Sequence, residues 1–361
     1  MPDPGNDRLV ELLLAMADRE ASDLHLVAGY RPMYRIHGEL ASAGETPLQP
    51  GEAISLVRSL APADVTGRLD AETDLDFAIQ IDNEAGAPRR FRVNVFCSQG
   101  DRGACFRAIA DSAPILSELG FPVELGERIL SLKNGLVLLT GITGSGKTTS
   151  LAALIQILNE RGGTRIITIE EPIEYIYTPA SDSIVSQREV GRDVASFYDG
   201  LRFGLRQDPD VLLVGEIRDR ETAQLALSAA ETGHLIFATL HTIDAKGAIT
   251  RLVDLFPSEM HQDVRTQLAM NLRFVIAQHL LPSGAGGRRT LAMEVLFANF
   301  AVRSAIRQGK IENVESAIQS GRKDGMYSLD TNLRQLVEQD RISLETARAF
   351  AKDPTEFGGL N

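Results

Sequence analysis

The chain has 361 residues, of which 43% are hydrophobic and 24% charged, enough for one large or two medium domains with ordinary cores, and two domains are expected. Its 37 basic and 49 acidic residues give a formal net charge of -12, which disfavours a nonspecific grip on nucleic acid or on anionic lipid. The sequence offers no apolar stretch near the ~20 residues of a membrane span and no basic and apolar signal peptide at its start, so a cytoplasmic protein is expected.

The first third of the chain has the pattern of a small α+β module. Residues 9–17 have the apolar spacing of a helix. Strand-like alternation follows at 24–27, 33–40, 74–79, 90–96 and 104–109. We therefore expect an N-terminal domain over residues 1–110 and a linker over residues 111–122, which hold two prolines and a glycine. Cys97 and Cys105 lie in this module, too few for a four-cysteine zinc site, and are expected to be reduced packing residues.

Residues 141–148 read GITGSGKT and fit the phosphate-loop pattern G-x-x-x-x-G-K-[ST], the Walker A motif. In such a loop, backbone N–H groups and one lysine cradle nucleotide phosphates. The apolar residues 135–140 before it read as a buried strand, and residues 149–158 after it read as a helix, which is the context the motif requires. The expected nucleotide-binding residues are Gly141, Thr143, Gly144, Ser145, Gly146, Lys147, Thr148 and, as a secondary contact, Thr149.

Three more apolar strand candidates follow the phosphate loop, with helical stretches between them. They cover residues 165–170, 211–216 and 234–240. The alternation of strands and helices predicts a parallel sheet, and such sheets hold ligands at the carboxyl ends of their strands. The residues expected to face the same nucleotide at these ends are Glu170, Glu171, Glu174, Glu216 and His241.

The chemistry of ATP hydrolysis suggests a role for several of these residues. Negative charge spreads over the γ-phosphate, so catalysis depends on positioning and on compensating charge. Lys147 is expected to neutralise the β- and γ-phosphates, and Thr148 to offer its hydroxyl to Mg²⁺. Glu216 would hold the Mg²⁺ shell or orient the attacking water, while His234 and His241 would sense the γ-phosphate. The alternative for each is an ordinary solvated charge at the end of a strand.

Four motifs in this order resemble one family. Besides the Walker A motif, residues 168–174 are similar to an Asp box, residues 213–216 to an atypical Walker B motif, and residues 232–242 contain the two parts of a His box. Together they resemble the secretion-superfamily hexameric ATPases (the type II/IV secretion ATPase family), and specifically the PilT/PilU-like retraction ATPases of type IV pili. Residues 21–26 and 301–307 also resemble family segments, and the second of these is linked to retraction.

The resemblance covers nearly the whole chain and implies its fold and its function. It implies an α/β fold in which a small N-terminal PAS-like α+β domain precedes a RecA-like P-loop ATPase domain over residues 123–361, with helices at the C-terminus. It implies a homohexameric motor that binds ATP and Mg²⁺ and powers pilus retraction in twitching motility through domain rotation. The implied partners are the inner-membrane platform protein of the pilus machine and a paralogous retraction ATPase, with no nucleic acid. The implied place is the cytoplasm, peripherally associated with the inner membrane through that machine.

The resemblance also implies roles for residues that the motifs alone do not assign. Glu174 would aim the attacking water and accept its proton. Arg92 and Arg107 match arginines of the family and would reach ATP on a neighbouring subunit, or else be ordinary surface charges. Arg102 lies in a loop that departs from the family, and Glu171 stands where most relatives carry aspartate. Two further positions are noted on the same basis: His279, where arginine is common, and the helical pair Arg303 and Arg307, which would transmit force, bind a partner or simply be exposed.

Three alternatives stay open. An assembly or secretion ATPase of the same superfamily usually carries an extra N-terminal domain and a four-cysteine insert, and two distant cysteines argue against it. A nucleic-acid-translocating P-loop motor would need a basic surface, against which the acidic balance argues. A nucleotide-gated binding protein without useful turnover is the third.

Overall fold

The computed structural model describes residues 4–36, 38–82, 86–109, 112–180, 182–284 and 289–358. The chain divides into two compact units: the first comprises Met1–Ser112 and the short segment Glu174–Ile176, and the second comprises Ala113–Ile173 and Tyr177–Asn361. The predicted domain boundary at residues 110 and 111 lies outside the described residues. Among the helices described, none is long and apolar enough to cross a membrane.

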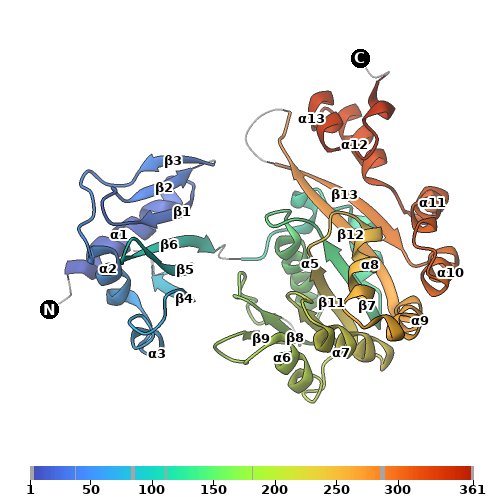
Figure 1. Cartoon of the computed structure of the whole chain (residues 1–361), viewed down its shortest axis with the longest axis horizontal. Helices are drawn as coiled ribbons and strands as arrows, with labels where there is room; N and C mark the ends of the chain where they lie inside the picture. Colours follow the sequence, from blue (N-terminus) through green and yellow to red (C-terminus); the bar gives the residue numbers. More distant parts are fainter. Residues whose placement is uncertain are drawn as a thin grey trace. The chain divides into compact units, whose positions relative to one another are not determined.

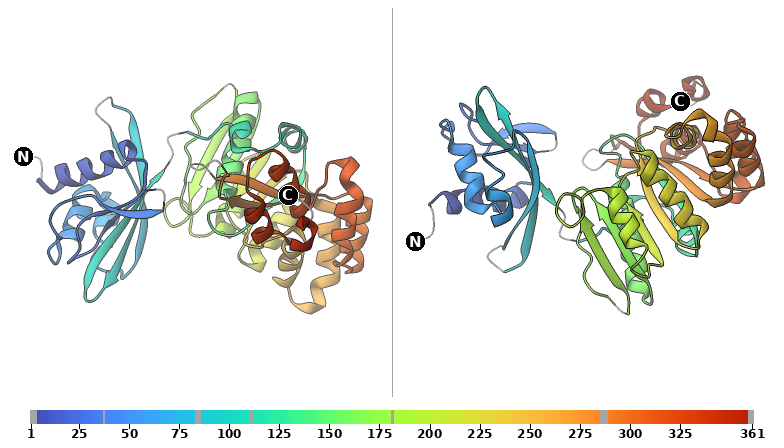
Figure 2. Two further views of the ribbon diagram at one scale, coloured as in Figure 1. Left: turned by 90° about the horizontal axis from the view of Figure 1, so that it is seen from above. Right: turned by 60° about the horizontal axis from the view of Figure 1, so that its bottom comes forward.

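The first unit is a six-stranded antiparallel sheet with helices on one face (Figure 1). Its strands are β1 (Ala21–Leu26), β2 (Met33–Ile36), β3 (Glu39–Ser42), β4 (Leu75–Asp82), β5 (Pro88–Ser98) and β6 (Asp101–Ile109), in the spatial order β3-β2-β1-β6-β5-β4. Its helices are α1 (Pro4–Asp18), α2 (Glu52–Leu60) and α3 (Ala63–Thr66). Figure 2 shows α1 and α2 on the same side of this sheet.

Strict alternation along the strands gives this sheet one apolar and one polar face. In β5, Phe91, Val93 and Val95 are buried in the core, so the residues between them point to the other face. Residues 33–40, expected to form one alternating segment, divide into β2 and the start of β3, with Gly38 at a φ of 93° between the two strands.

The second unit is built on a seven-stranded sheet. Its strands are β7 (Gly135–Thr140), β8 (Arg165–Glu170), β9 (Ile184–Glu189), β10 (Val211–Val214), β11 (Leu235–Leu240), β12 (Leu272–Leu281) and β13 (Thr290–Phe297), in the spatial order β13-β12-β7-β11-β10-β8-β9. Every pairing is parallel except that of β12 with β13. All residues of β7 and β11 are buried, as expected for central strands covered on both faces.

Helices cover this sheet and continue past it at the C-terminus. The helices are α4 (Val123–Leu130), α5 (Lys147–Arg161), α6 (Phe197–Gly204), α7 (Arg220–Glu231), α8 (Ala245–Asp254), α9 (His261–Asn271), α10 (Phe300–Gln308), α11 (Asn313–Ser320), α12 (Leu329–Glu338) and α13 (Leu344–Phe350). The last four follow the β12–β13 hairpin and form the C-terminal extension (Figure 1). The α/β fold class expected from the sequence, a small N-terminal α+β unit before a parallel-sheet unit with C-terminal helices, is confirmed.

Two expectations about individual side chains change. Cys97 and Cys105 are both free cysteines, but Cys97 is exposed and so is not a packing residue. Burial raises the pKa of the Cys105 thiol. In α10, Arg303 is half-buried with its Nε enclosed, whereas Arg307 is exposed, so the two arginines do not form one solvated face.

Candidate nucleotide site

The phosphate loop joins the end of β7 to the start of α5, and its shape depends on glycine. Gly141 has a φ of 146°, and a Cβ there would overlap the carbonyl oxygen of Gln278 and the Oγ of Ser145. Gly146 caps α5 with a φ of 89°. A side chain at Gly141 would therefore both strain the backbone and push the loop away from β12.

Inside this loop lies the side chain of Lys147, which is only 8% exposed. Its Nζ donates to the carbonyl oxygens of Gly141 at 2.7 Å and Ile142 at 3.1 Å. The Oγ of Ser145 is buried and has no hydrogen-bond partner among the described residues. One ammonium, a buried hydroxyl and the backbone N–H groups at the start of α5 form a donor set that suits the phosphates of a nucleotide.

Charged side chains from three neighbouring strand ends form a connected row beside this loop. Because β8, β10 and β11 are parallel, their carboxyl ends meet at the same edge as the end of β7. The Oε2 of Glu216 lies 2.7 Å from the Nε of Arg218, and its Oε1 lies 3.4 Å from the Nε2 of His241. The Nη1 of Arg218 in turn lies 2.7 Å from the Oε2 of Glu171. We call Glu171, Arg218, Glu216 and His241 the strand-end row.

The neighbouring carboxylates keep the guanidinium of Arg218 protonated. Partial burial alone would lower the pKa of this guanidinium, but the hydrogen bond and charge of Glu216, followed by those of Glu171, raise its pKa above the ordinary value. Both carboxylates are therefore held by a permanent cation, and one oxygen of Glu216 faces His241 instead.

Threonine hydroxyls tie this edge together. The backbone N–H of Thr242, directly after His241, donates to the Oγ1 of Thr140 at the end of β7 at 2.9 Å. On the other side of β11, the hydroxyl of Thr239 donates to the carbonyl oxygen of Gly215. A movement of His241 would therefore displace both Thr140, which precedes the phosphate loop, and Gly215, which precedes Glu216.

Some residues that were expected to face the nucleotide at this edge are buried or lie away from the strand ends. Glu170 is 5% exposed and accepts hydrogen bonds from the Oγ1 of Thr168 at 2.6 Å and the Nε2 of Gln187 at 3.3 Å, so it is committed to the interior of the sheet. Glu174 is half-buried and lies four residues beyond the end of β8. Thr148 and Thr149 are half-buried in the first turn of α5.

His234 lies at the wrong end of its strand for the expected contact with the γ-phosphate. It precedes β11, whereas His241 follows it. The two histidines are seven residue steps apart along an extended strand, which at ~3.3 Å a step is about 23 Å. The Nδ1 of His234 lies 3.1 Å from the carbonyl oxygen of Ala229 and 3.3 Å from the Oγ1 of Thr232, which gives it a local structural role.

In the first unit, the register of the sheet brings two of the three expected arginines together. Arg92 on β5 pairs directly with Arg107 on β6. Arg102 instead donates to backbone carbonyl oxygens, of Glu72 at 2.8 Å and Asp70 at 3.4 Å, and so serves the fold of this unit.

Three residues near the phosphate loop were not expected from the sequence. Arg218 is the centre of the strand-end row, and its only sequence signal is its position two residues after Glu216. Gln278 is fully buried and donates to the Oγ of Ser150 in α5 at 2.7 Å. Arg289 donates to the carbonyl oxygen of Gly144 at 3.3 Å. Gln278 comes to the loop through the pairing of β12 with β7, and Arg289 directly precedes β13, which pairs with β12; no local pattern reveals either pairing.

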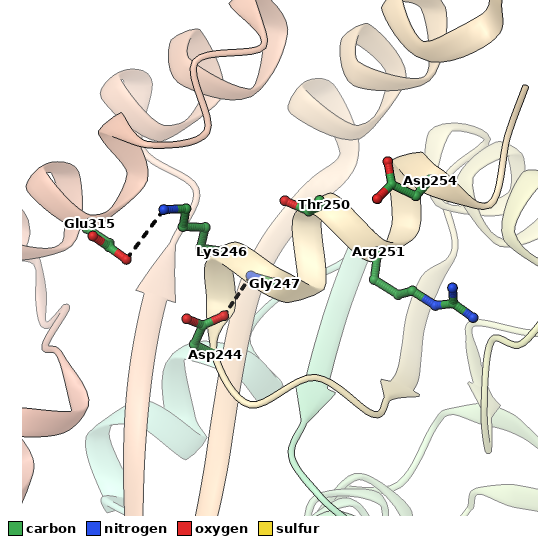
Figure 3. Close-up of a pocket in the computed structure, with 7 residues that line it drawn as sticks. All are labelled: Asp244, Lys246, Gly247, Thr250, Arg251, Asp254 and Glu315. Carbon is green, nitrogen blue, oxygen red and sulfur yellow. Dashed lines mark hydrogen bonds and ion pairs between the residues drawn. The ribbon is translucent and has the colours of Figure 1, made fainter. Parts of the chain in front are cut away.

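A hollow of about 410 Å³ lies along α8, the helix that follows His241 (Figure 3). Its charged lining comes from Asp244, Lys246, Arg251, Asp254 and Glu315, and the Nζ of Lys246 lies 3.7 Å from the Oε1 of Glu315. None of the residues expected to bind nucleotide lines it. No cluster of three or more His, Cys, Asp or Glu side chains suited to a metal ion occurs among the described residues.

Comparisons with known proteins agree with this architecture. A family model described as "Type II/IV secretion system protein" matches residues 7–353. The chain is 42% identical to the type IV pilus retraction ATPase PilT of Pseudomonas aeruginosa, over 97% of this chain and 99% of that protein. It is 37% identical to the type IV pilus ATPase PilU of the same organism, over 96% of this chain and 89% of that protein. A crystal structure of the pilus retraction motor PilT with bound ADP superposes with a TM-score of 0.85 at 41% identity, covering 96% of this chain and 98% of that one. The resemblance inferred from the motifs is confirmed: the chain belongs to the type II/IV secretion system protein family.

Proposed function

We propose that this chain is an ATPase that works as a homohexameric motor and powers the retraction of type IV pili. The observation that carries the proposal is the strand-end row beside a complete phosphate loop, in a chain similar over almost its whole length to retraction ATPases. The buried ammonium of Lys147 and the connected carboxylates are what phosphoryl transfer to water requires.

In this proposal each residue around the phosphate loop and the strand ends has one task. Lys147 exchanges its carbonyl partners for phosphate oxygens and compensates their charge. Thr148 and Glu216 hold the shell of Mg²⁺, which when bound neutralises charge on the β- and γ-phosphates. Glu174 orients the attacking water and accepts its proton. Arg218 engages the Oε2 of Glu216, and His241, which lies beside the Oε1 of Glu216, senses the γ-phosphate.

The remaining binding residues belong to the same loop. Its backbone N–H groups and hydroxyls would contact the phosphates: Gly141, Thr143, Gly144, Ser145, Gly146 and Thr149. His234 would act on nucleotide only from a different subunit, because within one subunit it lies at the opposite edge of the sheet.

The first unit supplies the cations that a ring would share. Arg92 and Arg107 lie side by side on one sheet face, and we propose that they reach ATP held by a neighbouring subunit. The proposed domains are a PAS-like N-terminal domain over residues 1–110, a linker over residues 111–122 and a RecA-like ATPase domain over residues 123–361. An isolated subunit would then hydrolyse ATP poorly.

The proposed setting is the cytoplasmic side of the pilus machine. The motor would contact the inner-membrane platform protein and work with a paralogous retraction ATPase, and it would need no nucleic acid. The net charge of -12 supports the last point. An assembly or secretion ATPase of the same family is the main rival. It is disfavoured by the extent of the similarity to PilT and by the presence of only two cysteines.

The test is made in cells that lack the gene and are complemented with wild type or with Glu174→Gln. We expect excess pili and no twitching in the deletion strain, restored by wild type and not by the variant. Cells without pili would identify an assembly motor, and unchanged pili with normal twitching would contradict the proposal.

A further inference from the structure

The segment at residues 21–26, which reads ASDLHL, has no role in the nucleotide site described above. It forms β1, the central strand of the first sheet, with β6 on one side and β2 on the other. Within it, Asp23 stands opposite Arg107, and Arg107 stands opposite Arg92 on the next strand. On the other side of β1, Arg35 of β2 stands opposite Asp23, so one row across the polar face of the sheet holds a carboxylate and three arginines.

Asp23 is an unusual residue for a polar sheet face because it is 3% exposed. Its Oδ1 accepts a hydrogen bond from the Nε of Arg107 at 2.8 Å, and its Oδ2 accepts one from the Oγ of Ser22 at 2.7 Å. Both oxygens of the carboxylate are thus fixed. A buried charge requires this kind of pairing, and the pairing holds the arginine in turn.

The geometry of the pair leaves the outer end of Arg107 available. The guanidinium is tied to Asp23 through Nε, the donor nearest the main chain, and the side chain is still 63% exposed. Within the part of the chain that the structure describes, the Nη groups of Arg107 make no recorded hydrogen bond. Those two groups form the fork that binds phosphate oxygens most effectively.

Arg92 is held much less firmly. Its Nε lies 3.3 Å from the Oδ1 of Asp76, and both side chains are partly exposed, at 36% and 51%. An exposed pair of this kind restricts an arginine little. The two arginines face each other across the strands, but only Arg107 has a buried anchor.

We propose that Asp23 is a positioning residue that presents the Nη groups of Arg107 to the phosphates of ATP bound by another subunit. The inference rests on the proposed function, in which Arg107 acts across a subunit boundary. An arginine whose rotamer is already fixed loses less conformational entropy when it meets the phosphate. Residues 21–26 would then affect ATP hydrolysis through the position of Arg107 on β6.

A purely structural role for Asp23 makes a different prediction. Two arginines directly opposite each other repel, and Asp23 could serve only to offset that repulsion. Its removal would then lower stability and leave hydrolysis in the folded ring unchanged. Removal should be tolerated by the fold, because both hydrogen-bond donors, Ser22 and Arg107, are exposed and can turn to water.

The experiment compares steady-state ATP hydrolysis and thermal unfolding of the full chain and four variants: Asp23→Ala, Arg107→Ala, the double variant and Asp70→Ala. Asp70 accepts from Arg58 at 2.6 Å in the same unit and is the control for loss of an arginine-bound carboxylate away from the row, although its side chain is exposed. We expect Asp23→Ala to lower kcat ~10-fold or more with little change in KM, because misplacing a catalytic group costs rate. The double variant should be no slower than Arg107→Ala, since a positioning residue has nothing left to position.

Each other outcome has a defined meaning. Wild-type kcat in Asp23→Ala with a low kcat in Arg107→Ala would overturn this inference and leave the proposed function intact. Wild-type kcat in Arg107→Ala would overturn the proposed action of this arginine and the inference with it. Additive losses in the double variant would show that Asp23 acts independently of Arg107, which also overturns the inference.

A second readout separates positioning from instability. Subunits carrying Asp23→Ala keep an intact phosphate loop, so mixing them with Glu174→Gln subunits should restore part of the hydrolysis. Mixing them with Arg107→Ala subunits should restore none, because both lack the same shared cation. Equal results in the two mixtures would contradict the proposal, whatever the melting temperatures.

Discussion

Arg218 and Glu171 lie 2.7 Å apart between Nη1 and Oε2, and they join the segment after β10 to the segment after β8. The same guanidinium holds Glu216 through its Nε, also at 2.7 Å. The longer side chain of Glu171, which was a departure from the resembled family at the level of sequence, therefore has a defined partner. One cation sets the position of carboxylates from two motifs.

Replacing Arg218 by alanine should reduce ATP hydrolysis ~10-fold or more, because the Glu216 carboxylate would lose its orientation. The free energy of unfolding should change by no more than about 1 kcal/mol, since the side chain of Arg218 is 57% exposed and water screens its ion pairs. Steady-state hydrolysis and urea unfolding check both parts.

Glu127→Ala is the control for this prediction. Glu127 pairs with Arg161 at 2.6 Å with comparable exposure, and neither residue belongs to the strand-end row. Its loss should leave hydrolysis unchanged. Equal hydrolysis by Arg218→Ala and wild type would show that the strand-end row has no bearing on catalysis.

Gly141→Ala should abolish nucleotide binding, because the added Cβ has no room beside Gln278 and Ser145. Gly163→Ala is the matched control. Gly163 also has a positive φ, of 66°, but a Cβ there meets nothing within 4 Å. The control should therefore lose about 1 kcal/mol of stability to backbone strain and bind nucleotide normally. Isothermal titration with ADP measures both, and equal affinities would mean that the loop geometry is wrong.

Lys147→Ala should weaken nucleotide binding by at least ~100-fold, because the loss removes a buried cation that faces phosphate charge. The loop should remain folded, since Lys147 contributes two hydrogen bonds to loop carbonyls that can turn to water. Fluorescence titration with a labelled nucleotide provides the affinity. Unchanged binding would contradict the assignment of the phosphate loop.

The stability of the second unit should fall in mild acid through His279. Burial lowers the pKa of this histidine below its ordinary 6.5, although its hydrogen bond to the carbonyl of Ile243 and the charge of Glu294 oppose the shift. Below pH 6.5 the unfolded chain therefore binds more protons than the folded one, so the free energy of unfolding decreases as the pH drops. Above pH 6.5 this contribution vanishes.

His279→Gln should remove that part of the pH dependence. Urea unfolding at pH 5.5 and pH 7.5 measures the slope for wild type and variant. His25, whose pKa is also lowered by burial, lies on β1 in the first unit and should add the same pH dependence to the unfolding of that unit in both proteins. A slope that is the same in the variant would show that His279 does not titrate with unfolding.

The sequence predicted four of the seven strands of the second sheet, β7, β8, β10 and β11, because buried parallel strands are continuous apolar segments, but it did not predict β9, β12 and β13 as strands. β7 and β8 have the predicted bounds, and β10 ends only two residues early, which leaves Glu216 outside the strand. The phosphate loop was predictable because its glycine and lysine spacing is a local requirement of one turn. Register was not predictable, so the pairing of Arg92 with Arg107 had to come from the structure.

Contacts between distant strand ends explain what sequence reasoning missed. His234 and His241 belong to one motif in the sequence, yet an extended strand carries them to opposite edges of the sheet. Arg218 becomes significant only when β8 and β10 lie side by side. Gln278 depends on β12 entering the sheet beside β7, and Arg289 depends on β13 pairing with β12. None of these relations leaves a periodic or local pattern in the chain.

We propose that this chain hydrolyses ATP at the edge formed by the strand ends. The most direct test is a comparison of phosphate release and ATP binding by wild type and Glu174→Gln. The variant should bind ATP with near-normal affinity and hydrolyse it at least ~100-fold more slowly, because a general base contributes a factor of about 10² to 10⁴. Equal rates of hydrolysis in the two proteins would contradict this proposal and would favour a nucleotide-gated binding protein.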